Sequence, residues 1–191
     1  MSPFEQSVGR RILMGAALAG VAGCTPGRDL PELPPYRPQS YGLGPGDQLR
    51  ILTFGEEQLT GEFRVDDQGR IAFPLIGNID AAGRSPKDLE DEIANALIKG
   101  DYLKQPHVTV EVTGYRPIFV LGEVTRPGQY PYQPSMTFLT AVAVAGGFTY
   151  RAVQDYGAVI RTTGRDAAKG RVTANDFLAP GDVVQVLERY F

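Results

Sequence analysis

Apolar and polar residues alternate along several stretches of the chain, and each such stretch predicts a β-strand with one buried face. The clearest is residues 107–113, where every second position from Val108 to Val112 is valine and the intervening positions are polar. A side-chain period of two is the pattern of a half-buried strand. Further strands are predicted from apolar runs at residues 48–54, 116–122, 157–162 and 182–187.

Two other strand-like runs, residues 63–65 and 70–73, are separated by a short polar segment that ends in Gly69. Glycine at the end of such a segment suits a turn that needs a positive φ. The pattern therefore predicts a hairpin in which these two runs pair with each other.

One segment changes to a helical period. Ser85, Pro86 and Asp88 form an N-cap, a first-turn proline and a capping acid, which together predict a helix start. An apolar stripe then recurs at every fourth position, and Gly100 is expected to end the helix. The stripe consists of Leu89, Ile93 and Leu97.

The second half of the chain has its own turn and helix signals. Pro127 and Gly128 predict a turn, and Thr137 is a candidate N-cap for a short buried helix over residues 137–145. Gly146 and Gly147 are expected to stop that helix. Strands and helices in both halves predict an α+β protein of two small mixed lobes.

A five-residue motif, Leu-x-Pro-Gly-Asp, occurs twice and precedes an apolar strand each time. In such a turn proline sets the first dihedral, glycine supplies a left-handed one, and aspartate accepts hydrogen bonds from backbone amides. We expect these acids to be structural, with a ligand or metal role as the alternative. The turn residues are Gly44, Pro45, Gly46 and Asp47 in the first copy and Pro180, Gly181 and Asp182 in the second.

The N-terminus resembles the export signal of a bacterial lipoprotein. Arg10 and Arg11 precede an apolar run at residues 12–23, and Cys24, the only cysteine, follows small residues. Twelve residues are too few to span a bilayer, which takes about 20. We expect residues 1–23 to be a signal peptide and Cys24 to be lipidated; a small buried cysteine is the alternative.

Residues 24–40 are rich in proline and predict an extended tether. Thr25, next to Cys24, is not the aspartate that retains lipoproteins at the inner membrane. The lipidated chain is therefore expected at the outer membrane, facing the periplasm.

Composition and net charge limit the classes of partner that the chain is expected to bind. The net charge of −3 and the pI near 5.2 provide no basic surface, so nucleic acid is not expected as a partner. About 150 residues remain after the signal and tether, enough for one ordinary domain or two small ones.

The residues favour no enzyme class. His107 is the only histidine and no Gly-x-Ser-x-Gly motif occurs, which argues against serine-histidine catalysis. The acidic pairs at residues 56–57 and 66–67 are adjacent in the chain, and adjacent strand side chains point to opposite faces. One histidine and one lipidated cysteine cannot supply a zinc site, so no metal or cofactor is expected.

Taken in order, these motifs resemble the polysaccharide export outer-membrane protein family. Residues 41–51 and 65–77 with the following helix are similar to that family's polysaccharide export sequence domain, placed at 41–114. Residues 120–130, 141–147 and 178–186 are similar to its soluble-ligand-binding β-grasp (SLBB) domain, placed at 115–191.

The resemblance implies a homo-oligomeric ring that conducts a polysaccharide outward above an inner-membrane polysaccharide co-polymerase. Larger relatives continue into an amphipathic helix that crosses the outer membrane, so the resemblance implies a short form without that helix. Either a separate outer-membrane pore protein completes the channel, or the chain is a periplasmic conduit or adaptor. An adaptor that binds a glycan or an envelope partner without conducting anything is the alternative function.

Four aromatic residues lie close together in the sequence of the second half. They are candidate sugar-stacking residues, with core or subunit-interface anchors as the favoured alternative. The four are Tyr130, Tyr132, Phe148 and Tyr150.

Overall fold

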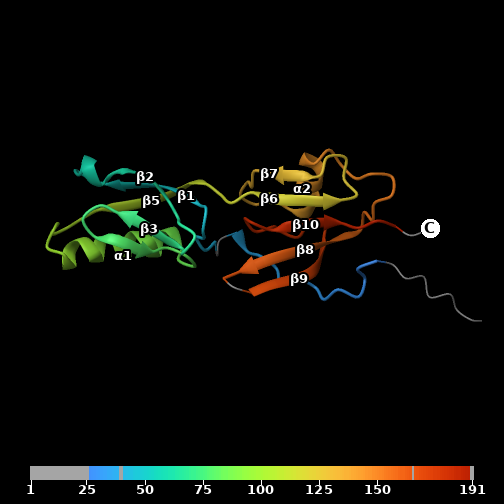
Figure 1. Cartoon of the computed structure of the whole chain (residues 1–191), viewed down its shortest axis with the longest axis horizontal. Helices are drawn as coiled ribbons and strands as arrows, with labels where there is room; N and C mark the ends of the chain where they lie inside the picture. The colour runs from blue at the N-terminus through green and yellow to red at the C-terminus, as the bar shows by residue number, and fades with distance from the viewer. Residues whose placement is uncertain (1–25, 39–40, 165, 190–191) are drawn as a thin grey trace, which may run out of the picture.

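The structure is a computed structural model that describes residues 26–38, 41–164 and 166–189. The expected signal peptide and Cys24 lie outside these residues. The chain forms two lobes arranged along the long axis, with β1 to β5 in one and β6 to β10 in the other (Figure 1). Each lobe has its own hydrophobic core, so the expected α+β fold of two mixed lobes is confirmed. No helix in these ranges is long and apolar enough to cross a membrane.

The first lobe is built on a three-stranded antiparallel sheet in the order β2-β1-β5. A two-stranded sheet of β3 and β4 and the helix α1 complete it. Leu49 and Ile51 of β1 are fully buried, and Leu89, Ile93 and Leu97 of α1 pack into the same core. The elements are β1 (Gln48–Thr53), the 3-10 helix η2 (Glu57–Leu59), β2 (Gly61–Arg64), β3 (Arg70–Phe73), β4 (Gly77–Asp80), α1 (Pro86–Lys99) and β5 (Val108–Gly114).

The hairpin predicted between residues 63–65 and 70–73 is wrong. The turn itself forms, because Asp66 accepts from the backbone amides of Gln68 and Arg70 at 2.9 and 2.8 Å. The strands on its two sides then separate: β2 pairs with β1, and β3 pairs with β4, a strand that the pattern did not predict. The turn sets the local reversal, but each strand pairs with its other neighbour along the chain, β2 with the preceding β1 and β3 with the following β4.

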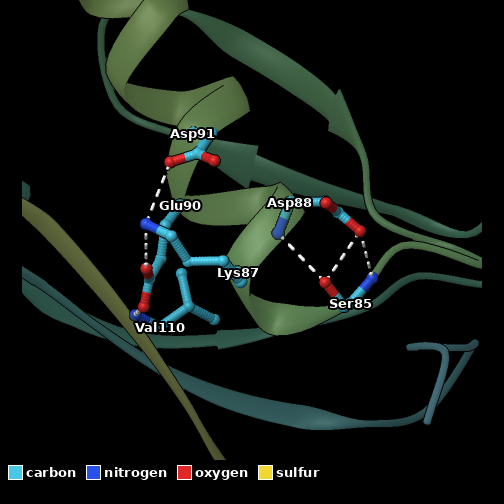
Figure 2. A network of polar contacts seen from close by, with 6 residues as sticks. All are labelled: Ser85, Lys87, Asp88, Glu90, Asp91 and Val110. Carbon is cyan, nitrogen blue, oxygen red and sulfur yellow. Dashed lines mark hydrogen bonds and ion pairs between the residues drawn. The ribbon is translucent and has the colours of Figure 1, made fainter. Parts of the chain in front are cut away.

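Helix α1 begins as predicted. Ser85 accepts from the Asp88 amide at 3.1 Å, and the Asp88 carboxylate accepts from the Ser85 amide at 3.2 Å, a complete capping box (Figure 2). The carboxylate of Glu90 accepts from the backbone amide of Val110 in β5 at 3.0 Å (Figure 2). This contact occupies an amide on the edge strand of the sheet and ties α1 to it.

The second lobe is a five-stranded mixed sheet in the order β7-β6-β10-β8-β9, in which only β10 and β6 run parallel. Helix α2 begins at the predicted N-cap Thr137, and its Phe138 is fully buried. The elements are β6 (Ile118–Gly122), β7 (Gly128–Tyr130), α2 (Phe138–Val144), β8 (Tyr156–Thr163), β9 (Asp166–Thr173) and β10 (Val183–Val186).

The sequence pattern does not predict strand β9, because most of its side chains are small, polar or charged and exposed. It forms because it pairs with β8 over its whole length, from Thr173 opposite Tyr156 to Asp166 opposite Thr163. Backbone pairing to an already placed strand is sufficient here, without a regular apolar face.

The proline-rich segment before the first lobe lies against the second lobe, beside β9 (Figure 1). The amide of Leu33 donates to the carbonyl of Arg171 at 3.1 Å, and the amide of Arg171 donates to the carbonyl of Pro31 at 2.7 Å. Leu33 also packs against the second core. Residues 26–29 form a turn, and the residues after them cover the outer edge of the sheet.

Candidate functional site

The two Pro-Gly-Asp turns each place a carboxylate in the interior. Asp47 is fully buried and Asp182 is 1% exposed. Asp47 Oδ2 accepts from the Gly44 amide at 2.7 Å, and Asp182 Oδ2 accepts from the Ala179 amide at 2.8 Å. The glycine before each acid has a positive φ, +97° in Gly46 and +88° in Gly181, which is why the motif needs glycine there.

Each buried acid is paired with an arginine from elsewhere in the chain. Arg161 of β8 makes a forked contact with Asp182, with Nε 3.0 Å from Oδ1 and Nη2 2.7 Å from Oδ2. Arg116 Nε lies 3.4 Å from Asp47 Oδ1 and is not aligned for a hydrogen bond, so this contact is an ion pair only. Buried carboxylates need such partners, because an unpaired charge in the interior is costly.

Arg116 stands at the junction of the two lobes. It belongs to the three residues between β5 and β6, and its backbone amide donates to Asp47 Oδ1 at 3.2 Å. A Cβ built on Gly44 would lie 2.7 Å from Arg116 Nη1, and one on Gly181 would lie 3.9 Å from it. The guanidinium therefore lies close to both Pro-Gly-Asp turns and links the lobes.

Four tyrosines form a continuous row across the same junction, which we call the tyrosine row: Tyr41, Tyr115, Tyr132 and Tyr36. The rings of Tyr41 and Tyr115 are 5.3 Å apart and those of Tyr115 and Tyr132 5.5 Å apart, both edge to face. Tyr36 of the N-terminal segment interacts electrostatically with Tyr132, and each affects the pKa of the other. The row runs from the first lobe through the linker and the second lobe to the N-terminal segment.

Arginine cations flank both ends of the row. Arg116 lies 6.0 Å from the ring centre of Tyr41, and Arg161 lies 5.4 Å from that of Tyr36. Arg161 also donates through Nη1 to the carbonyl of Pro34 at 3.1 Å. The pair that supports the second turn thus also holds the N-terminal segment in place.

The environment of the row keeps its hydroxyls protonated. Burial raises the pKa of Tyr41 above its ordinary value, and the hydrogen bond to Asp47 and the charge of Asp47 raise it further. Burial is also the largest cause of the raised pKa of Tyr132, of Tyr115 and of Tyr36.

The four aromatic residues singled out in the sequence do not lie on one surface. Tyr132 is buried within the tyrosine row, and Phe148 packs against the second core near Phe138. Tyr130 is partly buried and donates its hydroxyl to the carbonyl of Arg126. Only Tyr150 among the four has an open ring, with 79% of the residue exposed.

We call the two buried acids at the junction and the arginines paired with them the clasp: Asp47 with Arg116 and Asp182 with Arg161. Among the residues that the structure describes, no group of three His, Cys, Asp or Glu side chains could hold a metal ion. Asp47 and Asp182 are occupied by backbone amides and arginines of the chain itself. Pro127 and Gly128 lie apart from the clasp, at the start of β7. The sequence pattern identified the acids but missed Arg116 and Arg161, which no local signal connects to them.

Comparison with known proteins gives two family matches. Residues 35–113 match the model of the polysaccharide biosynthesis/export protein family, and residues 117–173 match that of the SLBB domain. The boundary between the matches falls in the linker that contains Arg116.

Curated relatives are similar over most of this chain. The exopolysaccharide production protein ExoF of Rhizobium meliloti (strain 1021) is 31% identical over 166 residues, covering 80% of this chain and 36% of the relative. The EPS I polysaccharide export outer membrane protein EpsA of Ralstonia nicotianae is 31% identical over 184 residues, covering 84% and 44%. The polysialic acid transport protein KpsD of Escherichia coli is 27% identical over 143 residues, covering 74% and 25%. The chain thus spans less than half the length of each of these relatives.

Proposed function

Because the chain belongs to the polysaccharide biosynthesis/export protein family and carries an SLBB domain after its export domain, we propose that it is an outer-membrane component of a capsule or exopolysaccharide export machine. The observation that carries the proposal is the order of the two family domains over one continuous chain. The relatives named for polysaccharide production, export and transport support the substrate class. The proposal assigns transport and no chemical step to the protein.

The proposed anchor is a lipid on Cys24, with the two lobes facing the periplasm. The support is the basic and apolar segment before Cys24 and the small residues directly preceding it. One acyl chain binds a membrane only marginally, whereas the several chains of a lipoprotein hold it stably.

The proposed working form is a homo-oligomeric ring that conducts the glycan between an inner-membrane polysaccharide co-polymerase and an outer-membrane pore protein. The clasp supports this form: the short linker and the Asp47–Arg116 pair hold the two lobes in one orientation. Identical subunits close a ring only if each presents its two contact surfaces at a constant angle.

The experiment is secretion of exopolysaccharide by a strain that lacks the gene, complemented with wild type or with Cys24→Ser behind an intact export signal. We expect the deletion to abolish secreted polymer, wild type to restore it, and Cys24→Ser to fail. Undiminished secretion in the deletion strain, without a second copy of the gene, would refute the export function. Full rescue by Cys24→Ser would refute the anchor alone.

The second candidate is an envelope adaptor that binds a glycan or a protein without conducting polymer, favoured by the exposed ring of Tyr150. The mass of the lipidated protein extracted in detergent together with its co-polymerase separates the two functions. A ring predicts several copies of the mature chain per particle, each lighter than the 20.7 kDa of the full sequence by the mass of residues 1–23. A single copy per particle would favour the adaptor.

A further inference from the structure

A cleft lies at one end of the exposed face of the three-stranded sheet of the first lobe, and none of its lining residues belongs to the clasp. The cleft lies beside the end of β1, on the side of the sheet opposite the core. Leu52 pairs with Thr109 across the two strands, and the amide of Phe54 donates to the carbonyl of His107 at 3.0 Å. Paired residues of antiparallel strands point to the same face, so these four side chains line one surface. The intervening Ile51 and Thr53 are buried on the other side.

The loop after β1 forms the second wall. Thr60 holds this loop in shape: its hydroxyl accepts from the Thr53 amide at 3.0 Å and donates to the Glu56 carbonyl at 3.1 Å. Leu59 in η2 is buried in the first core and anchors the loop from below. The cleft is therefore a formed feature. Its volume is about 790 Å3, and its lining includes Leu52, Phe54, Glu56, Glu57, His107 and Thr109.

Phe54 is the most open large apolar residue of the described chain, with 85% of the residue exposed. Beside it, Leu52 is 41% exposed. Most of the exposed lining surface is apolar, and the lining also includes the polar residues Glu56, Glu57, His107 and Thr109. A surface with one open aromatic ring and a polar border suits a ligand that has an apolar face and hydroxyl groups at its edge. A pyranose ring has this chemistry.

The charge of the cleft lining favours neutral glycans over acidic ones. Glu56 and Glu57 line the cleft, and no lysine or arginine does. No ion pair among the described residues engages either carboxylate. A sugar acid would meet these two negative charges in the cleft, whereas sugar hydroxyls can donate to the carboxylates.

We infer that this cleft binds a segment of neutral polysaccharide, with a hexose ring on Phe54 and its hydroxyls on Glu56, Glu57 and His107. The inference rests on the proposed export function, which makes a glycan the ligand that passes the protein. It adds that the export domain contacts the polymer and that the contact discriminates against acidic polymers.

The test measures binding of glucose, galactose and mannose hexaoses and of a galacturonic acid hexaose to the full mature chain, by calorimetry. Phe54→Ala is compared with Tyr102→Ala, which removes another exposed ring of the first lobe, 47% exposed, that does not line the cleft. We expect at least one neutral hexaose to bind, with an affinity reduced about tenfold by Phe54→Ala and unchanged by Tyr102→Ala. We expect the acidic hexaose to bind more weakly, and Glu56→Gln with Glu57→Gln to reduce the difference.

Three outcomes would overturn the inference: no neutral hexaose binds, Phe54→Ala leaves the affinity unchanged, or the acidic hexaose binds as tightly as the neutral ones. A change in particle mass in Phe54→Ala without a change in glycan affinity would also overturn it, in favour of a contact between copies. The same variants are assayed for secretion in the deletion strain. If the deletion abolishes secretion but Phe54→Ala changes neither binding nor secretion, the inference fails and the export function stands; if the deletion has no effect, the export function fails.

Discussion

Replacing Asp47 by asparagine should loosen the junction between the lobes, although the new side chain has nearly the same shape. Asp47 is fully buried and accepts from two backbone amides, Gly44 at Oδ2 and Arg116 at Oδ1. Whichever oxygen becomes the amide nitrogen of Asp47→Asn, one of these N–H groups then faces another donor. The Arg116 guanidinium also loses its anion.

The expected loss in the free energy of unfolding follows from these contacts. A buried donor without an acceptor costs about 1–3 kcal/mol. Breaking a buried ion pair costs about 3–5 kcal/mol, but the Arg116 side chain is 26% exposed and can regain water. We therefore expect Asp47→Asn to lower the free energy of unfolding of the first lobe by about 2–4 kcal/mol.

Hydrogen exchange measured by mass spectrometry reports each lobe separately, which suits a chain with two cores. The amides of β1 and β5 and of the linker should exchange faster in Asp47→Asn. Glu92→Gln is the control, because it breaks the Arg84–Glu92 pair at 3.0 Å, whose side chains are 36% and 45% exposed. An exposed pair contributes at most about 1 kcal/mol.

A loss in Asp47→Asn no larger than that in Glu92→Gln would refute the argument that a buried, paired charge holds the junction. Asp182→Asn is a second comparison. It breaks the equivalent pair with Arg161 inside the second lobe, so it should accelerate exchange in β8 and β10 and leave β1 unchanged. Equal effects of the two variants on both lobes would contradict separate roles for the Asp47–Arg116 and Asp182–Arg161 pairs.

Three further predictions concern other parts of the chain. Because folding raises the pKa of Tyr41, the folded chain keeps a proton that the unfolded chain loses, so the free energy of unfolding is unaffected below about pH 10 and falls above it by about 1.4 kcal/mol per pH unit. An alkaline titration of phenolate absorbance checks this: Tyr41→Phe should remove a phenol that titrates later than an ordinary tyrosine. Ser85→Ala removes the cap of α1 and should cost about 1 kcal/mol in thermal unfolding, and a stability equal to wild type would contradict the capping role. A Cβ on Gly170 would lie 2.8 Å from the backbone of Leu33, so Gly170→Ala should displace the N-terminal segment and expose it to proteolysis; unchanged cleavage rates would show that the segment does not depend on this contact.

The ends of the two α-helices and the buried face of α1 can be predicted from residues that are close together in the sequence. Ser85, Asp88 and Gly100 delimit α1, and the spacing of its apolar residues identifies its buried face. Thr137 marks the start of α2 in the same way. These features depend on residues within about one helical turn of each other, and such interactions are present in the sequence itself.

The pairing partners of the strands and of the buried acids are set in the folded protein, and local residue patterns do not specify them. Strand β2 pairs with β1 instead of β3, and the polar strand β9 forms through its pairing with β8. Asp47 and Arg116 are 69 positions apart, and Arg161 reaches back 127 positions to Pro34. The two α-helices, most strands and the two Pro-Gly-Asp turns follow from local residue patterns. The clasp, the tyrosine row and the docked N-terminal segment arise only when folding brings those turns together, because burial and ion pairing act through space and leave no periodic signal along the chain.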